Sequence, residues 1–286
     1  MDKTSLQDWI GGSETAADLI SPERCIALAR ALDRADGGLT AGAPLPPLRH
    51  WLYFWSIATR ARLGRDGHPA LGGFLPDVSR FWGDAQTRRM WAGSRIAFHH
   101  PVPLGRPARR ISTVENVVEK SGRSGRLVFV TVRHEIYYGA TLCITDRHDI
   151  VYREEKPGAA LPPPEPAPTD QEWDEGFVAD PALLFRYSAL TFNGHRIHYD
   201  RDYARHVEGY EGLVVHGPLL ATLLIDFAGD AQPGRSLRGF SFRGRRPVID
   251  GRRFSLCGRM DGEDVLKLWI ADIDGALAMT AEARFA

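Results

Sequence analysis

Four polar side chains that can bind water or move protons lie within eight residues of one another: Asn193, His195, His198 and Asp200. A histidine with a pKa near the ordinary value of about 6.5 can accept or donate a proton at neutral pH. The Asn193 amide can orient a water molecule or a carbonyl group, but it cannot accept a proton. The stretch therefore predicts an acid–base site with His198 as the base and Asn193 as the orienting group.

The same stretch could also suggest a metal site, because His195, His198 and Asp200 all carry donor atoms. Their spacing is not a common zinc pattern, and no cysteine or third histidine is placed to complete a closed site. We therefore expect no metal and no cofactor.

A His-Gly pair, His216 and Gly217, opens the apolar run GPLLATLLIDFA. As the first residue of a helix, Gly217 would leave its N–H unpaired at the positive end of the helix dipole. That N–H could stabilise negative charge on a thioester carbonyl oxygen, and glycine would let the substrate approach closely. The start of a helix at a turn would explain the His216-Gly217 pair without a catalytic role. Because the pair follows the loop that carries His198, we favour the interpretation of Gly217 as an oxyanion donor.

The surrounding segments must hold these residues in place. Residues 180–192 predict a helix before the loop, and Asp200 could cap a short helix after it. The apolar run from Gly217 is hydrophobic on nearly every side, which predicts a central buried helix. A polar loop fixed against such a scaffold is a common place for binding and catalysis.

Arginines provide a second set of candidate ligands. Arg245 and Arg246 lie in the segment RGRRPV, and more arginines follow in GRR at 251–253. They could contact CoA phosphates or a substrate carboxylate, although solvated strand positions explain them equally well. The sequence contains no dinucleotide-binding GxGxxG after a strand, no Walker sequence and no GxSxG.

The chain divides at a proline-rich segment, KPGAALPPPEPAPT, which spans residues 156–169. Six prolines in fourteen residues exclude a helix or a central strand and predict an extended spacer. We therefore expect a linker at 156–170 between an N-terminal half, 1–155, and a C-terminal half, 171–286.

Strand signals dominate both halves. Residues 94–154 predict an antiparallel sheet, and strands resume at 237, after the apolar helix. Residues 14–34 read as helix, with a second helix beginning at Pro22. Both halves repeat the same order: an aromatic strand, a Pro and Gly turn, an Arg-Arg strand, a hairpin and a final strand. The simplest interpretation is a duplicated α+β domain, in which each half packs a helix on a curved antiparallel sheet.

The composition is that of an ordinary soluble globular protein, with 43% hydrophobic and 25% charged residues among 286. Basic and acidic residues number 36 each, which gives no support for a nucleic-acid partner. The three cysteines are far apart and lack metal spacing, as expected of reduced thiols. Because no signal peptide or membrane-length apolar stretch is present, we expect a cytoplasmic protein without a membrane partner.

The loop and the helix after it resemble a known motif. TFNGHRIHYDRDYA followed by GLVVHGPLLATLL resembles the hydratase-2 motif of MaoC-like hotdog enzymes, S-G-D-x-N-P-I-H-x-D-x-x-Y-A and then H-G. The N-terminal half resembles one branch of these enzymes through PPLRHWLYFW, DGHPALGGFLPDV, RRMWAG and EKSGRSGRLVFVTVRHEI. That branch contains mesaconyl-C4-CoA hydratases, itaconyl-CoA hydratases and mitochondrial dehydratases of fatty-acid synthesis.

The resemblance covers most of the chain from about residue 42. It implies a double hotdog, in which 1–155 is a structural half that supplies the acyl pocket and 171–286 carries the site. By position, His198 matches the motif histidine, Asp200 the helix-capping aspartate and Gly217 the oxyanion-hole glycine.

Two departures from the motif affect the expected chemistry. The motif's catalytic aspartate falls on Asn193, which leaves His198 as the obvious base. Its asparagine and proline fall on His195 and Arg196, both potential cations. One of these two could bind a free carboxylate on the acyl group, and His216 is a further candidate for substrate contact.

The resemblance thus implies a hydro-lyase that reversibly hydrates a short enoyl-CoA, expected to be a C5 dicarboxylic one such as itaconyl-CoA or mesaconyl-C4-CoA. One alternative is a 3-hydroxyacyl-thioester dehydratase of fatty-acid synthesis. Others are an acyl-CoA thioesterase and a non-catalytic acyl-thioester binding module. The expected partner is the acyl-CoA itself, and a homodimer is compatible with the fold.

Overall fold

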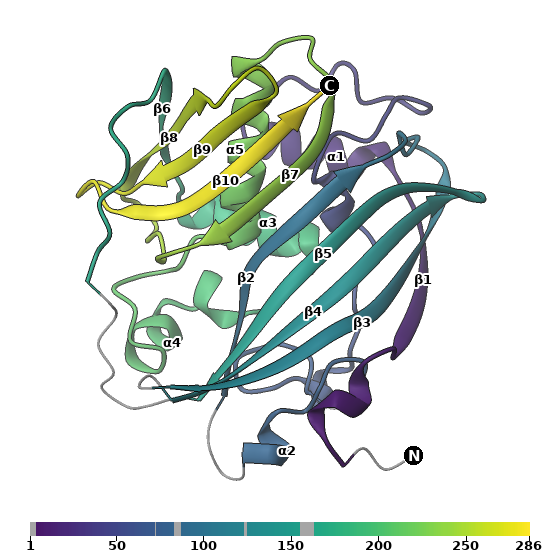
Figure 1. The fold of residues 1–286 in the computed structure, drawn as a ribbon, viewed down its shortest axis with the longest axis vertical. Coiled ribbons are helices and arrows are strands. Elements are labelled where there is room, and N and C mark those ends of the chain that lie inside the picture. The colour runs from purple at the N-terminus through teal and green to yellow at the C-terminus, as the bar shows by residue number, and fades with distance from the viewer. Residues whose placement is uncertain (1–3, 72, 83–86, 123–124, 155–162) are drawn as a thin grey trace.

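A computed structural model of the chain describes residues 4–71, 73–82, 87–122, 125–154 and 163–286 (Figure 1). The strands of the N-terminal half are β1 (Ser13–Leu19), β2 (Thr87–Phe98), β3 (Pro107–Gly122), β4 (Gly125–Tyr138) and β5 (Thr141–Glu154). Those of the C-terminal half are β6 (Trp173–Val178), β7 (Leu237–Gly244), β8 (Arg253–Met260), β9 (Val265–Ala271) and β10 (Leu277–Phe285). The helices are α1 (Pro22–Ala31), α2 (Ser79–Trp82), α3 (Pro181–Thr191), α4 (Arg201–His206) and α5 (Gly217–Ala231), with single 3-10 turns at Leu6–Trp9, Arg49–Leu52, Arg60–Arg62 and Arg196–His198.

The ten strands form one antiparallel sheet in the order β1-β3-β4-β5-β2-β7-β10-β9-β8-β6. The two halves of the sheet join where β2 pairs with β7 (Figure 1). Read outward from this junction, the halves have the same connectivity, β2-β5-β4-β3-β1 and β7-β10-β9-β8-β6. The structure confirms the expected α+β class and the repeated order of strands.

Helix α5 is the central helix of the C-terminal half. It packs against β7, β8, β9 and β10 on the same face of the sheet as α1 and α3 (Figure 1). Leu219 and Leu224 have no exposed surface, and the helix is buried along most of its length. Each buried leucine contributes about 2 kcal/mol of hydrophobic stabilisation, so the start of α5 is held rigidly.

The N-terminal half differs from the expected arrangement, because its described residues contain no long central helix. Residues 48–56, here called the central segment, pack into the same core as α5 instead. Arg49 forms an ion pair of 2.7 Å with Asp226 of α5. Pro46 and Pro47 precede the segment and Phe54 has a left-handed φ of 58°, so helix is limited to one turn.

The expected helix over residues 14–34 is wrong in its first part. Residues 13–19 form β1, which pairs antiparallel with β3 from Ser13 opposite Thr113 to Leu19 opposite Pro107. Sheet pairing overrides the weak helical pattern of this short stretch, and α1 begins at Pro22 as predicted.

Part of the expected linker is bound to the C-terminal half. Leu277 donates its N–H to the Glu165 carbonyl at 2.7 Å, and Pro166 bridges to Ala276. The boundary at 155 and residues up to 162 lie outside the described residues, so the division into two domains stays a prediction. No helix in the described ranges is long and apolar enough to cross a membrane.

Candidate functional site

The loop that carries the predicted site is shaped by Asn193. Helix α3 ends at Thr191 and is followed by Phe192, whose left-handed φ of 51° turns the chain. Asn193 then donates its N–H to the Ser188 carbonyl at 2.8 Å, and its Oδ1 accepts the His195 N–H at 3.0 Å. The side-chain oxygen therefore holds the turn, and the amide nitrogen remains to orient a reactant.

His198 lies on the 3-10 turn Arg196–His198 and is buried. Its Nδ1 is 2.7 Å from the Val214 carbonyl oxygen, which can only accept, so Nδ1 carries the proton. Within the described part of the chain, Nε2 has no hydrogen-bond partner. Burial lowers the pKa of His198 to about 4, so this nitrogen is an unprotonated base at neutral pH.

His216 supports the His198 ring. The two rings stack with centroids 3.6 Å apart and planes at 19°, and His216 Nε2 is 2.8 Å from Ser188 Oγ. Burial and the neighbouring His198 hold the pKa of His216 well below its ordinary value. His216 is 0% exposed, and its contact with the substrate stays a prediction. Its role here is to position His198.

Gly217 begins α5, as predicted, and its N–H has no hydrogen-bond partner among the described residues. The next residue is Pro218, which has no N–H. A Cβ added at Gly217 would meet no atom outside this helix turn within 4 Å, so the space beside the Gly217 Cα is open. This open space is compatible with the predicted approach of an oxyanion to Gly217.

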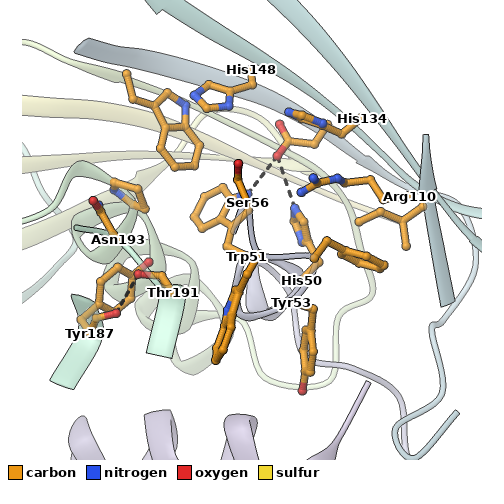
Figure 2. Close-up of a pocket in the computed structure, with 16 residues that line it drawn as sticks. His50, Trp51, Tyr53, Ser56, Arg110, His134, His148, Tyr187, Thr191 and Asn193 are labelled. Atoms are coloured by element: carbon orange, nitrogen blue, oxygen red, sulfur yellow. Dashed lines mark hydrogen bonds and ion pairs between the residues drawn. The ribbon is translucent and has the colours of Figure 1, made fainter. Parts of the chain in front are cut away.

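A cavity of about 230 Å³ lies between the two halves of the chain (Figure 2). The C-terminal half contributes Tyr187, Thr191, Asn193 and Pro218. The N-terminal half contributes His50, Trp51, Tyr53, Phe54, Trp55, Ser56, Trp91, Arg110, His134, Ile136, Asp146 and His148. Asn193 is the one predicted site residue on this lining, and Pro218 brings the start of α5 to it.

The cavity wall contains a buried carboxylate that the sequence analysis missed. Asp146 is 2% exposed, and its Oδ2 accepts from Trp51 Nε1 at 2.9 Å and contacts His50 Nε2 at 3.3 Å. Burial raises the pKa of Asp146, but the His50 hydrogen bond and the imidazoles of His134 and His148 more than offset this effect. Together they hold the pKa below its usual range.

Two histidines beside Asp146 were also missed. Burial lowers the pKa of His134 to about 3 and that of His148 to about 4, so both are neutral at pH 7. His134 Nδ1 is 2.8 Å from Ser112 Oγ. The sequence could have indicated them, because side chains alternate between the two faces of a strand. That alternation places these titratable residues on the core-facing side of β4 and β5.

His195 faces a loop of the N-terminal half. Its ring lies 4.2 Å from that of His68, whose Nδ1 is 3.0 Å from Asp66 Oδ2. Burial holds the pKa of His195 well below its ordinary value. A Cβ on Gly67 would lie 2.0 Å from the Gly194 carbonyl oxygen, so glycine is required where the two loops meet.

Asp66, His68 and His195 place donor atoms within 4.8 Å of one another. Two imidazoles and a carboxylate are a donor set that divalent transition metals accept. This trio differs from the set His195, His198 and Asp200 that the sequence suggested. His195 instead lies beside Asp66 and His68, which are distant in the chain. The expected absence of a metal stays a prediction.

Arg196 does not line the cavity. Its guanidinium forms an ion pair of 2.7 Å with Asp200 and lies 4.1 Å from the centroid of the Tyr203 ring. Its contact with a substrate carboxylate stays a prediction. Asp200 also accepts the Tyr203 N–H at 3.0 Å and caps α4 as predicted.

Arg245 and Arg246 follow β7 and are likewise absent from the cavity lining. Their backbone N–H groups both donate to the Ala278 carbonyl, and the Arg245 side chain is exposed. Contact of these arginines with CoA phosphates stays a prediction.

Comparison with known proteins identifies the family. The model of the family "hydroxyacyl-thioester dehydratase type 2" matches residues 48–250. The chain is 48% identical to the mesaconyl-C(4)-CoA hydratase of Chloroflexus aurantiacus over 284 residues, which cover 98% of each chain.

Two solved structures share the fold. A MaoC-like dehydratase from Phytophthora capsici has a TM-score of 0.72 at 14% identity, covering 99% of this chain and 98% of that one. A Mycobacterium tuberculosis protein described as a double hotdog has a TM-score of 0.59 at 11% identity, covering 97% and 96%. The chain has the double-hotdog fold and belongs to the hydroxyacyl-thioester dehydratase type 2 family.

Proposed function

We propose that the protein reversibly adds water across the α,β double bond of a short dicarboxylic enoyl-CoA, mesaconyl-C4-CoA or itaconyl-CoA. The substrate class is supported by the identity of 48% to a mesaconyl-C(4)-CoA hydratase. The chemistry is supported above all by the 2.7 Å contact between His198 Nδ1 and the Val214 carbonyl. This contact leaves Nε2 as a free base.

The reaction follows from these groups. A water molecule held by the Asn193 amide loses a proton to His198 Nε2, and its oxygen bonds to the β-carbon. The π electrons move toward the thioester carbonyl, whose developing charge accepts a hydrogen bond from the Gly217 N–H. His198 then returns the proton to the α-carbon, so one water is added and no redox equivalent is needed. In the reverse direction the same groups eliminate water.

The cavity suits a short acyl group. A volume of about 230 Å³ is below the range of typical drug-sized ligand pockets, and much of the lining is aromatic. The long acyl chains of fatty-acid synthesis would need a larger space. Three buried, unpaired cysteines, Cys25, Cys143 and Cys257, fit a reducing compartment, and we place the enzyme in the cytoplasm.

The test is to incubate purified protein with mesaconyl-C4-CoA, itaconyl-CoA and crotonyl-CoA and to follow product mass and free thiol in the same samples. The proposal predicts a gain of one water on a dicarboxylic substrate at a higher kcat/KM than on crotonyl-CoA. Release of free CoA thiol would indicate a thioesterase. Binding without product from any of the three would indicate an acyl-thioester binding module.

A further inference from the structure

A group of polar side chains occupies core-facing positions of the N-terminal half of the sheet. Arg110 lies between Ala108 and Ser112 on the buried side of β3, and Ser112 pairs with His134 of β4. His134 in turn pairs with Asp146 of β5. The other core-facing positions on these strands hold mostly valine and isoleucine. A sheet with a purely structural role would not place charged side chains on this face.

Several polar atoms of this group have no partner. Arg110 Nε, His148 Nε2 and His50 Nδ1 are buried and form no hydrogen bond within the described residues. Arg110 Nε can only donate a hydrogen bond, and a buried donor without a partner costs about 1–3 kcal/mol. Its place on the cavity therefore indicates a ligand that accepts this hydrogen bond.

Two side chains of opposite charge line the cavity, the Arg110 guanidinium and the Asp146 carboxylate, and Asp146 Oδ1 is also buried without a partner among the described residues. Among the described residues Arg110 forms one ion pair, with Glu14 at 3.9 Å, and its side chain is 20% exposed. Asp146 directs Oδ2 toward Trp51 and His50 and makes no ion pair with Arg110. The guanidinium therefore remains available at the cavity wall, where its planar set of donors matches a carboxylate.

Figure 2 shows Asn193 on one side of the cavity and Arg110 and His134 on the other. An acyl group whose thioester carbonyl lies near Gly217 would reach across the cavity toward Arg110. We infer that Arg110 and His148 bind the free carboxylate of the acyl group and thereby select dicarboxylic enoyl-CoA substrates. This inference rests on the proposed function and names the residues that determine its substrate class.

Asp146 affects the protonation of His148. Burial lowers the pKa of the His148 imidazole, and the negative charge of Asp146 opposes this effect. When a carboxylate enters, His148 takes up a proton and the added charge is balanced. Ligand binding should therefore consume protons, which a ligand without a free carboxylate would not do.

The test compares Arg110→Met with Arg109→Met. Arg109 is the neighbouring residue on β3, is exposed and lies over the Tyr137 ring at 5.0 Å, so its removal is a matched control. Binding of succinyl-CoA and butyryl-CoA, neither of which can be hydrated, is measured by calorimetry in two buffers of different ionisation enthalpy. Wild type and Arg109→Met should prefer succinyl-CoA and take up protons with it. Arg110→Met should lose affinity for succinyl-CoA by about 100-fold and bind butyryl-CoA within about threefold of wild type.

Equal losses for both ligands in Arg110→Met, or an unchanged preference, would overturn the inference. His148→Gln gives a second test if Arg110→Met does not fold, and it should abolish the proton uptake. Failure of the proposed function is recognised separately, because wild type would then hydrate none of the enoyl-CoA substrates. If wild type hydrates mesaconyl-C4-CoA but binds succinyl-CoA no better than butyryl-CoA, only the carboxylate site is wrong.

Discussion

The imidazole rings of His198 and His216 stack face to face, with centroids 3.6 Å apart, and both side chains are buried. Two stacked imidazoles cannot both carry a proton without strong repulsion, and burial already disfavours the charged form of each. The hydrogen bond from His198 Nδ1 to the Val214 carbonyl fixes the tautomer. The stack therefore keeps His198 Nε2 unprotonated and held in one orientation.

The pH dependence of the reaction follows from this arrangement. Burial lowers the pKa of His198 to about 4, and the base works when unprotonated. We predict that kcat/KM for hydration stays constant from pH 7 down to about 5 and falls only as the pH approaches about 4. Stopped-flow assays, short enough to precede acid unfolding, give the profile. An acid limb near pH 6.5 would show that His198 titrates as an ordinary histidine.

Gly217 offers a test of the oxyanion site. Since a Cβ at this position would contact no atom within 4 Å, Gly217→Val should change the free energy of unfolding by less than about 1 kcal/mol. The side chain would occupy the space beside the N–H, and we predict a fall in kcat/KM of about 100-fold. Gly229, also without contacts and exposed on the same helix, provides the control Gly229→Val. Equal activity in the two variants would argue against the oxyanion role.

The sequence predicted much of the C-terminal half because its signals are local. The apolar run from Gly217 is hydrophobic all round, and such a run can only be a buried helix in a soluble domain. Asp200 was recognisable as a cap because capping depends on a residue and the three that follow it. Motif spacing located Asn193 and His198, and the structure adds the bonds that fix the tautomer of His198.

The remaining parts depend on long-range contacts. β1 forms because β3, almost a hundred residues later, offers a partner edge. Arg196 was expected in the site, but in the structure it pairs with Asp200 and lies over the Tyr203 ring. Both contacts depend on the position of α4, which the sequence does not give. His134, Asp146 and His148 could have been found by asking which strand positions face the core. The sequence could not show that these residues share a cavity with Asn193, because that cavity forms only when the two halves of the chain pack together.

The trio of Asp66, His68 and His195 allows a test of metal dependence. We predict that treatment with EDTA and desalting leaves kcat unchanged. The Asp66 carboxylate is already hydrogen bonded to His68, and the positive charge of Arg89 acts on both imidazoles and disfavours a cation. Loss of activity that returns with Zn²⁺ but not with Mg²⁺ would instead assign these residues to a metal.

Acid should destabilise the fold through its buried histidines. The folded-state pKa values of His134, at about 3, and of His148 and His198, at about 4, lie below the ordinary value of about 6.5 expected in the unfolded chain. Between pH 6.5 and about 4 the unfolded chain therefore binds more protons, and stability falls as the pH falls. The loss is up to about 1.4 kcal/mol per pH unit for each histidine.

Urea unfolding at pH 7.5 and pH 5.0 measures this loss. His134→Phe should show a smaller difference between the two pH values than wild type, because one buried imidazole is gone. The exposed His206→Gln should show the wild-type difference. A free energy of unfolding that is the same at both pH values would mean that the three histidines titrate normally in the folded protein.

The most direct measurement is the kcat for hydration of mesaconyl-C4-CoA by His198→Asn beside wild type. The asparagine Nδ2 can replace Nδ1 as donor to the Val214 carbonyl, so the loop and the stacked partner keep their places while the base Nε2 is removed. We predict that kcat falls by about 10²–10⁴-fold, with the thermal midpoint and the affinity for succinyl-CoA close to wild type. Hydration at the wild-type rate by this variant would contradict the assignment of His198 as the base.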